Sequence, residues 1–508
     1  MPRALRWTLL ASAAVLATVL ALRPVDNFDL GFQLRIGEHV LTRGIPVTDP
    51  FSFPGEGKPW ALEQWLGPAL LQLAFRLGDI AGVIVFKALI AGAALALVTR
   101  AALLLSGNAL AAAVGALLAT VAAQVRFNAQ ANILSLLGLA AVLLACAQIH
   151  TARRVRPALW LLAVFAVWPH AHPGYLTGLV TLGAFCAGSL LLSIPALQRR
   201  LAPAPAPIPW RSLSLFGLGC VAISLGTLAL FHPMGLAPFW HVLGIFRSAT
   251  SRANIAEYAP LWDSYAVTAP LLLLWLVPPL AWALTRRPPP LALTLVSWLL
   301  AAQALQVGRL VSEAALAAAP VWSASVTALF AHLQASGQLD RLARSFSPAR
   351  AAALVITCAA LSAGLHLATP ERHTLAWTEA YYPKSCYDWI DAAHLPPRAF
   401  NDLGYGGSFI FHFDGRRKTF IDGRSFYSDA FFNDEYTPIK QARPGFQRIA
   451  ERWGIEWYLL HPSRFRALHE ALQRDPRMAL VHLEDMCAIY VLRSAWQPPP
   501  APGDPRAP

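Results

Sequence analysis

Residues 4–23, "ALRWTLLASAAVLATVLALR", form an almost unbroken apolar run, and residues 26–40, "DNFDLGFQLRIGEHV", follow it closely. The first stretch is long enough to cross the ~30 Å hydrocarbon core of a bilayer as a helix. The second places two carboxylates, Asp26 and Asp29, beside that expected membrane boundary. A carboxylate at such a boundary is costly unless it is paired or has a function. Together the two stretches predict a membrane protein whose first outside loop carries acids of functional interest.

Apolar runs of similar length recur along the chain. Its 508 residues are 56% hydrophobic and only 14% charged, with a mean hydropathy of +0.46. Soluble proteins carry more charge, so the composition predicts a polytopic α-helical membrane protein. We expect about 11 transmembrane helices from the number of apolar runs. They lie near residues 6–22, 81–100, 108–124, 130–149, 158–170, 175–196, 212–231, 267–284, 290–308, 311–332 and 351–369.

The distribution of the net charge of +13 indicates which loops are cytoplasmic. Residues 1–369 contain 24 basic and 11 acidic residues, whereas the remainder contains 17 of each. Most of the basic excess lies in short loops, "TARRVRP" (151–157), "QRR" (198–200), "TRRPPP" (285–290) and "DRLARSFSPAR" (340–350). This is the pattern of cytoplasmic loops, and it requires no nucleic-acid partner. We therefore expect a membrane protein with a cytoplasmic N-terminus and with residues 23–80, 232–266 and 370–508 outside.

The first outside loop, residues 23–80, contains seven of those 11 acidic residues. Phe28, Phe32, Ile36 and Val40 recur at helical spacing, and Gly44 is a natural stop. The proline-rich stretch "IPVTDPFSFPGEGKPW" is typical of turns, and "ALEQWLGPALLQLAFRLGD" is a second amphipathic segment. We predict two interfacial helices joined by an ordered turn.

Residues 370–495 read as a small extracytoplasmic α/β domain, followed by a disordered Pro-rich tail, 496–508. The predicted strands are 399–403, 418–423, 455–461, 479–485 and 487–493, and the predicted helices are 429–442, 444–453 and 465–475. "GYGGS" (404–408) is expected to form a Gly-rich turn. An oxidising compartment would allow Cys386 and Cys487 to form a disulfide, and two free thiols are the alternative.

Three stretches carry a family resemblance. They are "FDLGFQLRIGEHVLTRGIPVTDPFSFPGEGKPWALEQWLGPALL" (28–71), "WPHAHPGYLTGL" (168–179) and "FNDLGYGGSFIFHF" with "KTFIDGRSFYSD" (400–429). They resemble uncharacterised bacterial polytopic proteins of the GT-C glycosyltransferase type. The chain departs from that family at Gly31, Phe32 and Gln33, where the family has Trp-Trp-His, and at His170, where it has Asn.

The resemblance implies a GT-C-like fold, a polyprenyl-phosphate-linked sugar as donor and an acidic residue near the first helix as general base or metal ligand. Asp29 matches that acid, with Asp49 as a second catalytic candidate. The two carboxylates together could supply oxygens to Mg²⁺ or Mn²⁺. The acceptor is expected to be an envelope glycan, lipid or protein, and membrane lipids surround the chain.

Further candidates follow from the chemistry of the residues themselves. A lipid phosphate needs a cation, and Arg126 and Arg309 lie at expected outer helix ends, where snorkelling to the interface is the alternative role. His170 and His172 flank an outside turn and suit proton transfer, phosphate contact or simple packing. Asp422 and Arg424 either contact a sugar or form a structural turn pair. The full set of candidate substrate-binding residues is Asp26, Arg126, His170, His172, Glu257, Arg309, Asp422 and Arg424.

Three functions remain open on these grounds. The first is an external membrane glycosyltransferase, indicated by the acid-rich first loop. The second is a transporter or flippase for a lipid-linked envelope precursor, which would place charges in mid-membrane, where Lys87 and Glu313 are the main candidates. The third is a non-catalytic membrane scaffold, favoured by the departures from the family motif.

Overall fold

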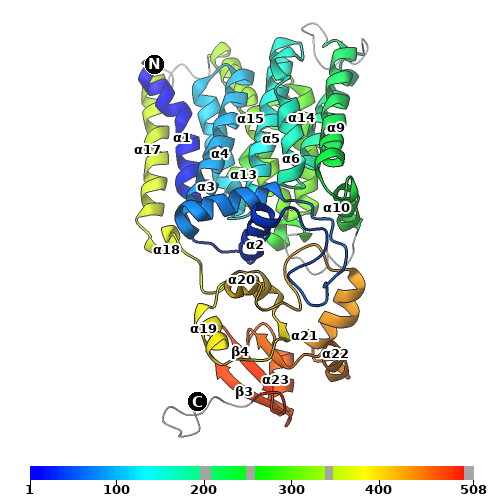
Figure 1. The fold of residues 1–508 in the computed structure, drawn as a ribbon. Coiled ribbons are helices and arrows are strands. Elements are labelled where there is room, and N and C mark those ends of the chain that lie inside the picture. The colour runs from blue at the N-terminus through cyan, green and yellow to red at the C-terminus, as the bar shows by residue number, and fades with distance from the viewer. Residues whose placement is uncertain (195–207, 248–257, 338–346, 497–508) are drawn as a thin grey trace. The chain divides into compact units, whose positions relative to one another are not determined.

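A computed structural model describes residues 1–194, 208–247, 258–337 and 347–496. The chain divides into two units (Figure 1). Unit 1 comprises Met1–Pro24, Ala81–Leu236 and Arg252–Leu375. Unit 2 comprises Val25–Ile80, Ala237–Ser251 and Ala376–Pro508. The first loop therefore belongs to the same unit as the C-terminal domain, although nearly 300 residues separate them in the sequence.

Unit 1 is a helical bundle, and a helix occupies each of the predicted apolar segments. The helices are α1 (Arg3–Ala21), the second part of α3 (Leu66–Ser106), α4 (Ala109–Ala123), α5 (Asn132–Ala152), α6 (Leu161–Ala171), α7 (Tyr175–Leu191), α9 (Trp210–Phe231), α13 (Ala269–Thr285), α14 (Leu291–Gln306), α15 (Val311–Ala335) and α17 (Pro348–Leu367). Shorter elements are η1 (Gln124–Arg126), η2 (Arg156–Ala158), η4 (Gly308–Leu310), α12 (Leu261–Ser264) and α18 (Pro370–His373).

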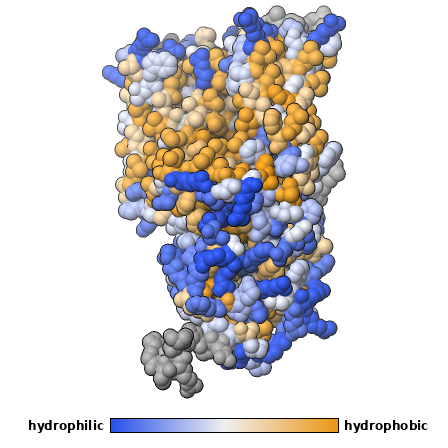
Figure 2. Space-filling view, in the orientation of Figure 1, coloured by the Kyte–Doolittle hydropathy of each residue, from blue (hydrophilic) through white to orange (hydrophobic). Residues whose placement is uncertain are grey.

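Seven of the described helices are long and apolar enough to cross a membrane, and α7, α13 and α14 are shorter apolar helices. On the face drawn in Figure 2, apolar side chains form a broad band over the middle of the bundle, whereas the surface of the C-terminal domain is mainly hydrophilic. The chain is a multi-pass membrane protein.

Small residues set the packing inside the bundle. Gly115 of α4 has no room for a Cβ because Ser323 of α15 lies against it. The Ser323 hydroxyl donates to the carbonyl of Ala111 at 3.0 Å, and that of Ser312 donates to Ala123 at 2.8 Å. Such small residues let helix backbones approach closely in a membrane. The alanine-rich runs of α4 and α15 thus form a tightly packed pair.

In unit 2, the first loop contains two helices and the segment that connects them. α2 (Leu30–Arg43) ends at Gly44, whose φ is 88°. α3 begins at Leu66 and breaks at Gly78 and Asp79, where the backbone is not helical. Glu38 of α2 pairs with Arg76, in the part of α3 before this break, at 2.9 Å. The short helix α10 (Ala237–Arg247) also belongs to unit 2.

The C-terminal part of unit 2 is the expected α/β domain. Its strands are β1 (Ala399–Asn401), β2 (Trp457–Leu460), β3 (Met478–Leu483) and β4 (Ala488–Leu492), in the order β1-β2-β4-β3. β1 and β2 run parallel, and the other pairs are antiparallel. The helices are α19 (Lys384–Ala392), α20 (Leu403–Phe413), the π-helix η5 (Phe431–Tyr436), α21 (Thr437–Lys440), α22 (Phe446–Trp453) and α23 (Arg466–Arg474).

Two local predictions for this domain are wrong. Residues 418–423 do not form a strand, because the Asn401 side chain binds their backbone instead: it accepts from the N–H of Phe420 and donates to the carbonyl of Ile421. "GYGGS" is not a turn but lies within α20. Asp402 caps that helix by accepting the N–H of Gly404 at 2.8 Å, which offsets the low helix propensity of the glycines.

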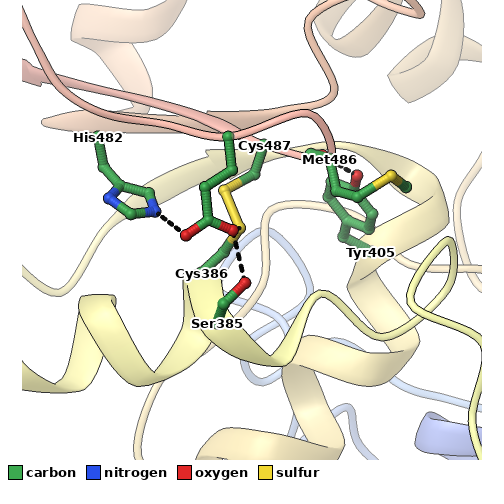
Figure 3. Close-up of a disulfide and its surroundings, with 7 residues drawn as sticks. Ser385, Cys386, Tyr405, His482, Met486 and Cys487 are labelled. Atoms are coloured by element: carbon green, nitrogen blue, oxygen red, sulfur yellow. Dashed lines mark hydrogen bonds and ion pairs between the residues drawn. A yellow bond between two sulfur atoms is a disulfide. The ribbon is translucent and has the colours of Figure 1, made fainter.

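Cys386 and Cys487 form a disulfide, which answers the question that the sequence left open. The bond joins α19 to the turn before β4 (Figure 3). Glu484 lies beside it and accepts from Ser385 at 2.5 Å and pairs with His482 at 2.9 Å. The ligand atoms of these four Cys, His and Glu side chains lie within 4.8 Å of one another, but two of them are the bonded sulfurs, so the cluster serves as a covalent link. The predicted disorder of the tail concerns residues almost wholly outside the described part of the chain.

Candidate active site

Asp29 occupies the N-cap position of α2. The side chain of Asn27 shapes this helix start, because its Oδ1 accepts the N–H groups of Asp29 and Leu30, both at 3.1 Å. Side-chain capping of this kind satisfies N–H groups that have no partner within the helix. The positive end of the helix dipole also favours a carboxylate at this position. Asp29 is therefore fixed in place by the local sequence that follows the first membrane helix.

Close backbone contacts bring three segments of unit 2 together around Asp29. A Cβ on Gly31 would overlap the carbonyl of Gly407, and one on Gly407 would overlap the carbonyl of Phe28. A Cβ on Gly423 would lie 2.5 Å from Oδ1 of Asp29. The first turn of α2, the middle of α20 and residues 422–424 thus meet at a junction formed by Gly31, Gly407 and Gly423, which we call the glycine junction.

The acids predicted from sequence meet Arg424 in a buried network. The guanidinium donates to Oδ1 of Asp49 at 2.6 Å and to both oxygens of Asp422 at 2.7 Å. The side chains of all three residues are at most 2% exposed. Tyr427 donates to Asp422 at 2.8 Å. Residues 49 and 422–424, far apart in sequence, are therefore held together as one ionic unit.

Electrostatics keep this network charged. Burial alone would raise the pKa of the Asp422 carboxyl, but the charge and hydrogen bonds of Arg424, with the Tyr427 hydroxyl, hold that pKa below its ordinary value. Burial would lower the pKa of Arg424, but the charges of Asp422 and Asp49 and the hydrogen bond to Asp422 hold it well above its ordinary value. Aromatic rings surround the guanidinium: the ring centroids of Trp60, Phe51 and Phe426 lie 4.7, 5.3 and 5.6 Å from it.

The contacts of Asp49 decide how well a divalent metal fits. Its Oδ1 accepts from Arg424 and from the N–H of Phe51, and its Oδ2 accepts from Ser52 and Arg424. Both oxygens already serve the ionic network. The residues present therefore do not fit the Mg²⁺ or Mn²⁺ site that was expected between Asp29 and Asp49, and the contacts make Asp49 a structural partner of Arg424.

A second group of candidates gathers in unit 1. Arg309 donates to the Tyr258 hydroxyl at 2.8 Å, and its guanidinium lies 5.0 Å from the centroid of that ring. Arg126, which is buried, donates to the hydroxyl of Tyr265 at 3.4 Å. The charges of Arg309 and Arg126 both act on His172. Two arginines that were nominated separately from sequence therefore both act electrostatically on His172, and we call Arg126 and Arg309 the arginine group.

Hydrogen bonds define the state of His172. Its Nδ1 lies 2.8 Å from Oγ of Ser135 and 3.0 Å from the backbone nitrogen of Gly174. Because Ser135 already accepts from Trp168 at 2.9 Å, its hydroxyl hydrogen is available to donate to Nδ1. This pattern assigns the neutral tautomer with its proton on Nε2. His170 differs, since it is buried with its ring edge-to-face on Phe231, at 6.4 Å.

Two of the nominated candidates remain. Asp26 is exposed, and Glu257 lies outside the described residues. Sequence reasoning did not single out Asn27, Ser135, Tyr258, Tyr265 or Gly423 for the site. The signal for Gly423 was its place in "DGR", between two charged residues that were themselves nominated, and the tyrosines could have been found as the aromatics that flank the short loop around α12.

No protein-family model and no curated protein matches the sequence. Among solved structures, the oligosaccharyltransferase AglB of Archaeoglobus fulgidus is 14% identical, with a TM-score of 0.59 over 90% of this chain and 69% of that chain. ArnT of Cupriavidus metallidurans, bound to undecaprenyl phosphate, is 14% identical, with a TM-score of 0.56 over 97% of this chain and 98% of that chain. The arabinofuranosyltransferase AftD from Mycobacteria is 16% identical, with a TM-score of 0.52 over 97% of this chain and 40% of that chain.

The chain has the GT-C fold. That conclusion agrees with the fold class expected from the sequence motifs. At this level of identity the likeness concerns the fold, and the residues of the site must be argued from this chain's own geometry.

Proposed function

We propose that this chain is an integral membrane glycosyltransferase that moves a sugar from a polyprenyl-phosphate donor to an envelope acceptor. The reaction would take place at the outer face of a bacterial inner membrane. The observation that carries the proposal is the place of Asp29 within the GT-C fold: it occupies the N-cap position of α2, the first helix after α1 in the sequence, and Gly423 of the glycine junction lies against its carboxylate. Two of the structural neighbours support the donor and acceptor classes, since one is bound to undecaprenyl phosphate and another to an acceptor peptide.

Asp29 would act as the general base. Transfer breaks the bond between the sugar's anomeric carbon and the phosphate oxygen, and it forms a bond from that carbon to an acceptor hydroxyl or amine. The acceptor must lose a proton as it attacks, and a carboxylate within hydrogen-bond reach can take that proton. Asp49 does not enter this role because its oxygens bind Arg424, Ser52 and Phe51.

The arginine group of unit 1 would bind the donor phosphate. A lipid phosphate that leaves with its negative charge needs cations fixed in advance, and guanidinium groups bind phosphate with paired hydrogen bonds. The Tyr258 hydroxyl that binds Arg309 is neutral, so this contact orients the guanidinium without cancelling its charge. The Nε2 proton of His172 would add a neutral donor to the same group.

The contacts of Lys87 favour an enzyme over a transporter. Lys87 is fully buried in α3, which at first suggests a mid-membrane charge. Its ammonium donates at 3.0 Å to the carbonyl of Arg23, two residues beyond the end of α1. Arg23 in turn donates to Asn128 at 2.7 Å, and Asn128 follows Arg126 closely in the sequence. Lys87 is thus bonded to the end of a span, where it can support the proposed phosphate site.

The test is turnover of polyprenyl-phosphate sugars by the purified chain in detergent. We expect wild type to release free polyprenyl phosphate and Asp29→Asn to lose at least about 100-fold in kcat, the size typical of a general base. Asp434→Asn, an exposed aspartate of η5, is the matched control and should retain activity. A folded wild type that turns over no donor in a broad panel would refute the transferase, and lipid movement in proteoliposomes would then support the flippase.

A further inference from the structure

The Asp29 carboxylate lies against Gly423, a residue without a side chain. A Cβ on Gly423 would come within 2.5 Å of Oδ1 of Asp29 and 3.1 Å of the Phe28 ring. Gly423 is not among the residues with positive φ, so its backbone conformation does not demand glycine. Glycine is required here because the Asp29 carboxylate and the Phe28 ring leave no room for a Cβ.

The backbone at Gly423 is held from both sides. Asp422 and Arg424 are bound to each other at 2.7 Å, and Arg424 is bound to Asp49 at 2.6 Å. Gly406 of α20 packs against the backbone of Asp422, since a Cβ on Gly406 would lie 2.6 Å from its Cα. With both neighbours buried and bonded, Gly423 cannot move aside without breaking the ionic network.

The other side of Asp29 is also fixed. Asn27 binds the N–H groups at the start of α2, and the carbonyl of Phe28 touches Gly407. The Asp29 main chain therefore cannot retreat easily from Gly423. The side chain lies between a capped helix start and a backbone that the Arg424 network holds in place.

We propose that Gly423, held by Asp422 and Arg424, is a positioning residue that sets the orientation of the Asp29 carboxylate. The inference rests on the proposed function, in which Asp29 is the base. It gives the buried "DGR" segment a role in the reaction without contact to substrate. A base displaced by about 1 Å from its working position can cost roughly 100-fold in rate, so a rigid neighbour at this point matters.

The first experiment measures kinetics of Gly423→Ala. We expect kcat to fall about 10- to 100-fold while KM changes little, because the donor site in unit 1 is untouched. Gly244→Ala is the matched control, since Gly244 lies in α10 of the same unit and a Cβ there meets nothing within 4 Å. Unchanged kcat in a folded Gly423→Ala variant, with Asp29→Asn inactive, would overturn the proposal.

The second experiment needs no activity. The melting temperature is measured for Gly423→Ala alone, Asp29→Ala alone and both together. If the added methyl collides with the Asp29 carboxylate, Gly423→Ala lowers the melting temperature by about 2–4 °C in the wild type and by clearly less in the Asp29→Ala background. An equal drop in both backgrounds overturns the proposal. A wild type without transferase activity would refute the proposed function, while this cycle would still decide whether Gly423 fixes Asp29.

Discussion

Arginines mark both candidate regions of the molecule, but their partners differ. In unit 2, Arg424 binds two buried carboxylates and is enclosed by aromatic rings, so its charge is neutralised by groups of the protein itself. In unit 1, Arg309 binds a tyrosine hydroxyl and is only partly buried. A guanidinium bound to carboxylates stabilises a fold, whereas one held by a neutral hydroxyl keeps its charge for an anionic ligand. The comparison separates a structural arginine from one suited to bind phosphate.

The largest expected effect comes from removing the structural arginine. Arg424→Met leaves the carboxylates of Asp49 and Asp422 buried next to each other without a cation. Breaking a buried ion pair in this way costs about 3–5 kcal/mol. Hydrogen exchange of the amides of β2 and β4 in the full chain measures this loss as faster opening of unit 2.

The pH dependence of that variant sharpens the test. In the wild type the lowered pKa of Asp422 contributes stability that is present at neutral pH and lost as pH falls through the folded-state pKa. The penalty in Arg424→Met should therefore shrink at acid pH, where the carboxylates are protonated. Arg448→Met, at an exposed residue of α22, should change stability by less than about 0.5 kcal/mol. Equal effects at the two positions would mean that the network is not structural.

The contrast between the regions also explains what the sequence could reveal. The bundle was predictable because membrane helices follow from runs of apolar residues, and α2 was predictable because Phe32, Ile36 and Gly44 obey local rules. The partner of Asp49 was not, because Arg424 lies 375 residues away and only the tertiary fold brings it near. For the same reason the neutral partner of Arg309 could not be read from the sequence, although the arginine itself could.

The next effect concerns the arginine proposed to bind donor. Arg309→Met should weaken binding of polyprenyl phosphate about 10- to 100-fold, since a hydrogen bond from a charged group contributes roughly 1.5–3 kcal/mol. The affinity of Arg309→Lys should lie between those of the wild type and Arg309→Met, because lysine keeps the charge but loses the paired donors. Titration in detergent measures the dissociation constant, and Arg287→Met, at an exposed arginine after α13, is the control. A lower melting temperature with unchanged affinity would instead place Arg309 with the structural arginines.

The smallest effect tests the same rule on a carboxylate with only a partial counter-charge. Asp402 is buried, and its Oδ2 lies 3.7 Å from Nη1 of Arg464, whose side chain is 40% exposed. Burial raises the pKa of Asp402, although Arg464 and the N–H of Gly404 act in the opposite direction. This is the reverse of Asp422, whose close, buried cation lowers its pKa.

A raised pKa fixes the sign of the pH dependence. The folded state then binds the Asp402 proton more tightly than the unfolded state does, so this residue's contribution falls as pH rises from the ordinary value of about 3.9 through the higher folded one. Asp402→Asn removes the buried charge but keeps the oxygen that accepts from Gly404. We expect the variant to be more stable than wild type at pH 8 by about 1 kcal/mol or less, with no advantage at pH 4. Hydrogen exchange of β1 and β2 at the two pH values measures the difference. If the wild type is instead the more stable protein at pH 8, a partly exposed arginine at 3.7 Å is enough to compensate a buried carboxylate. The distinction between Arg424 and Arg309 would then rest on the burial of the arginine and not on the identity of its partner.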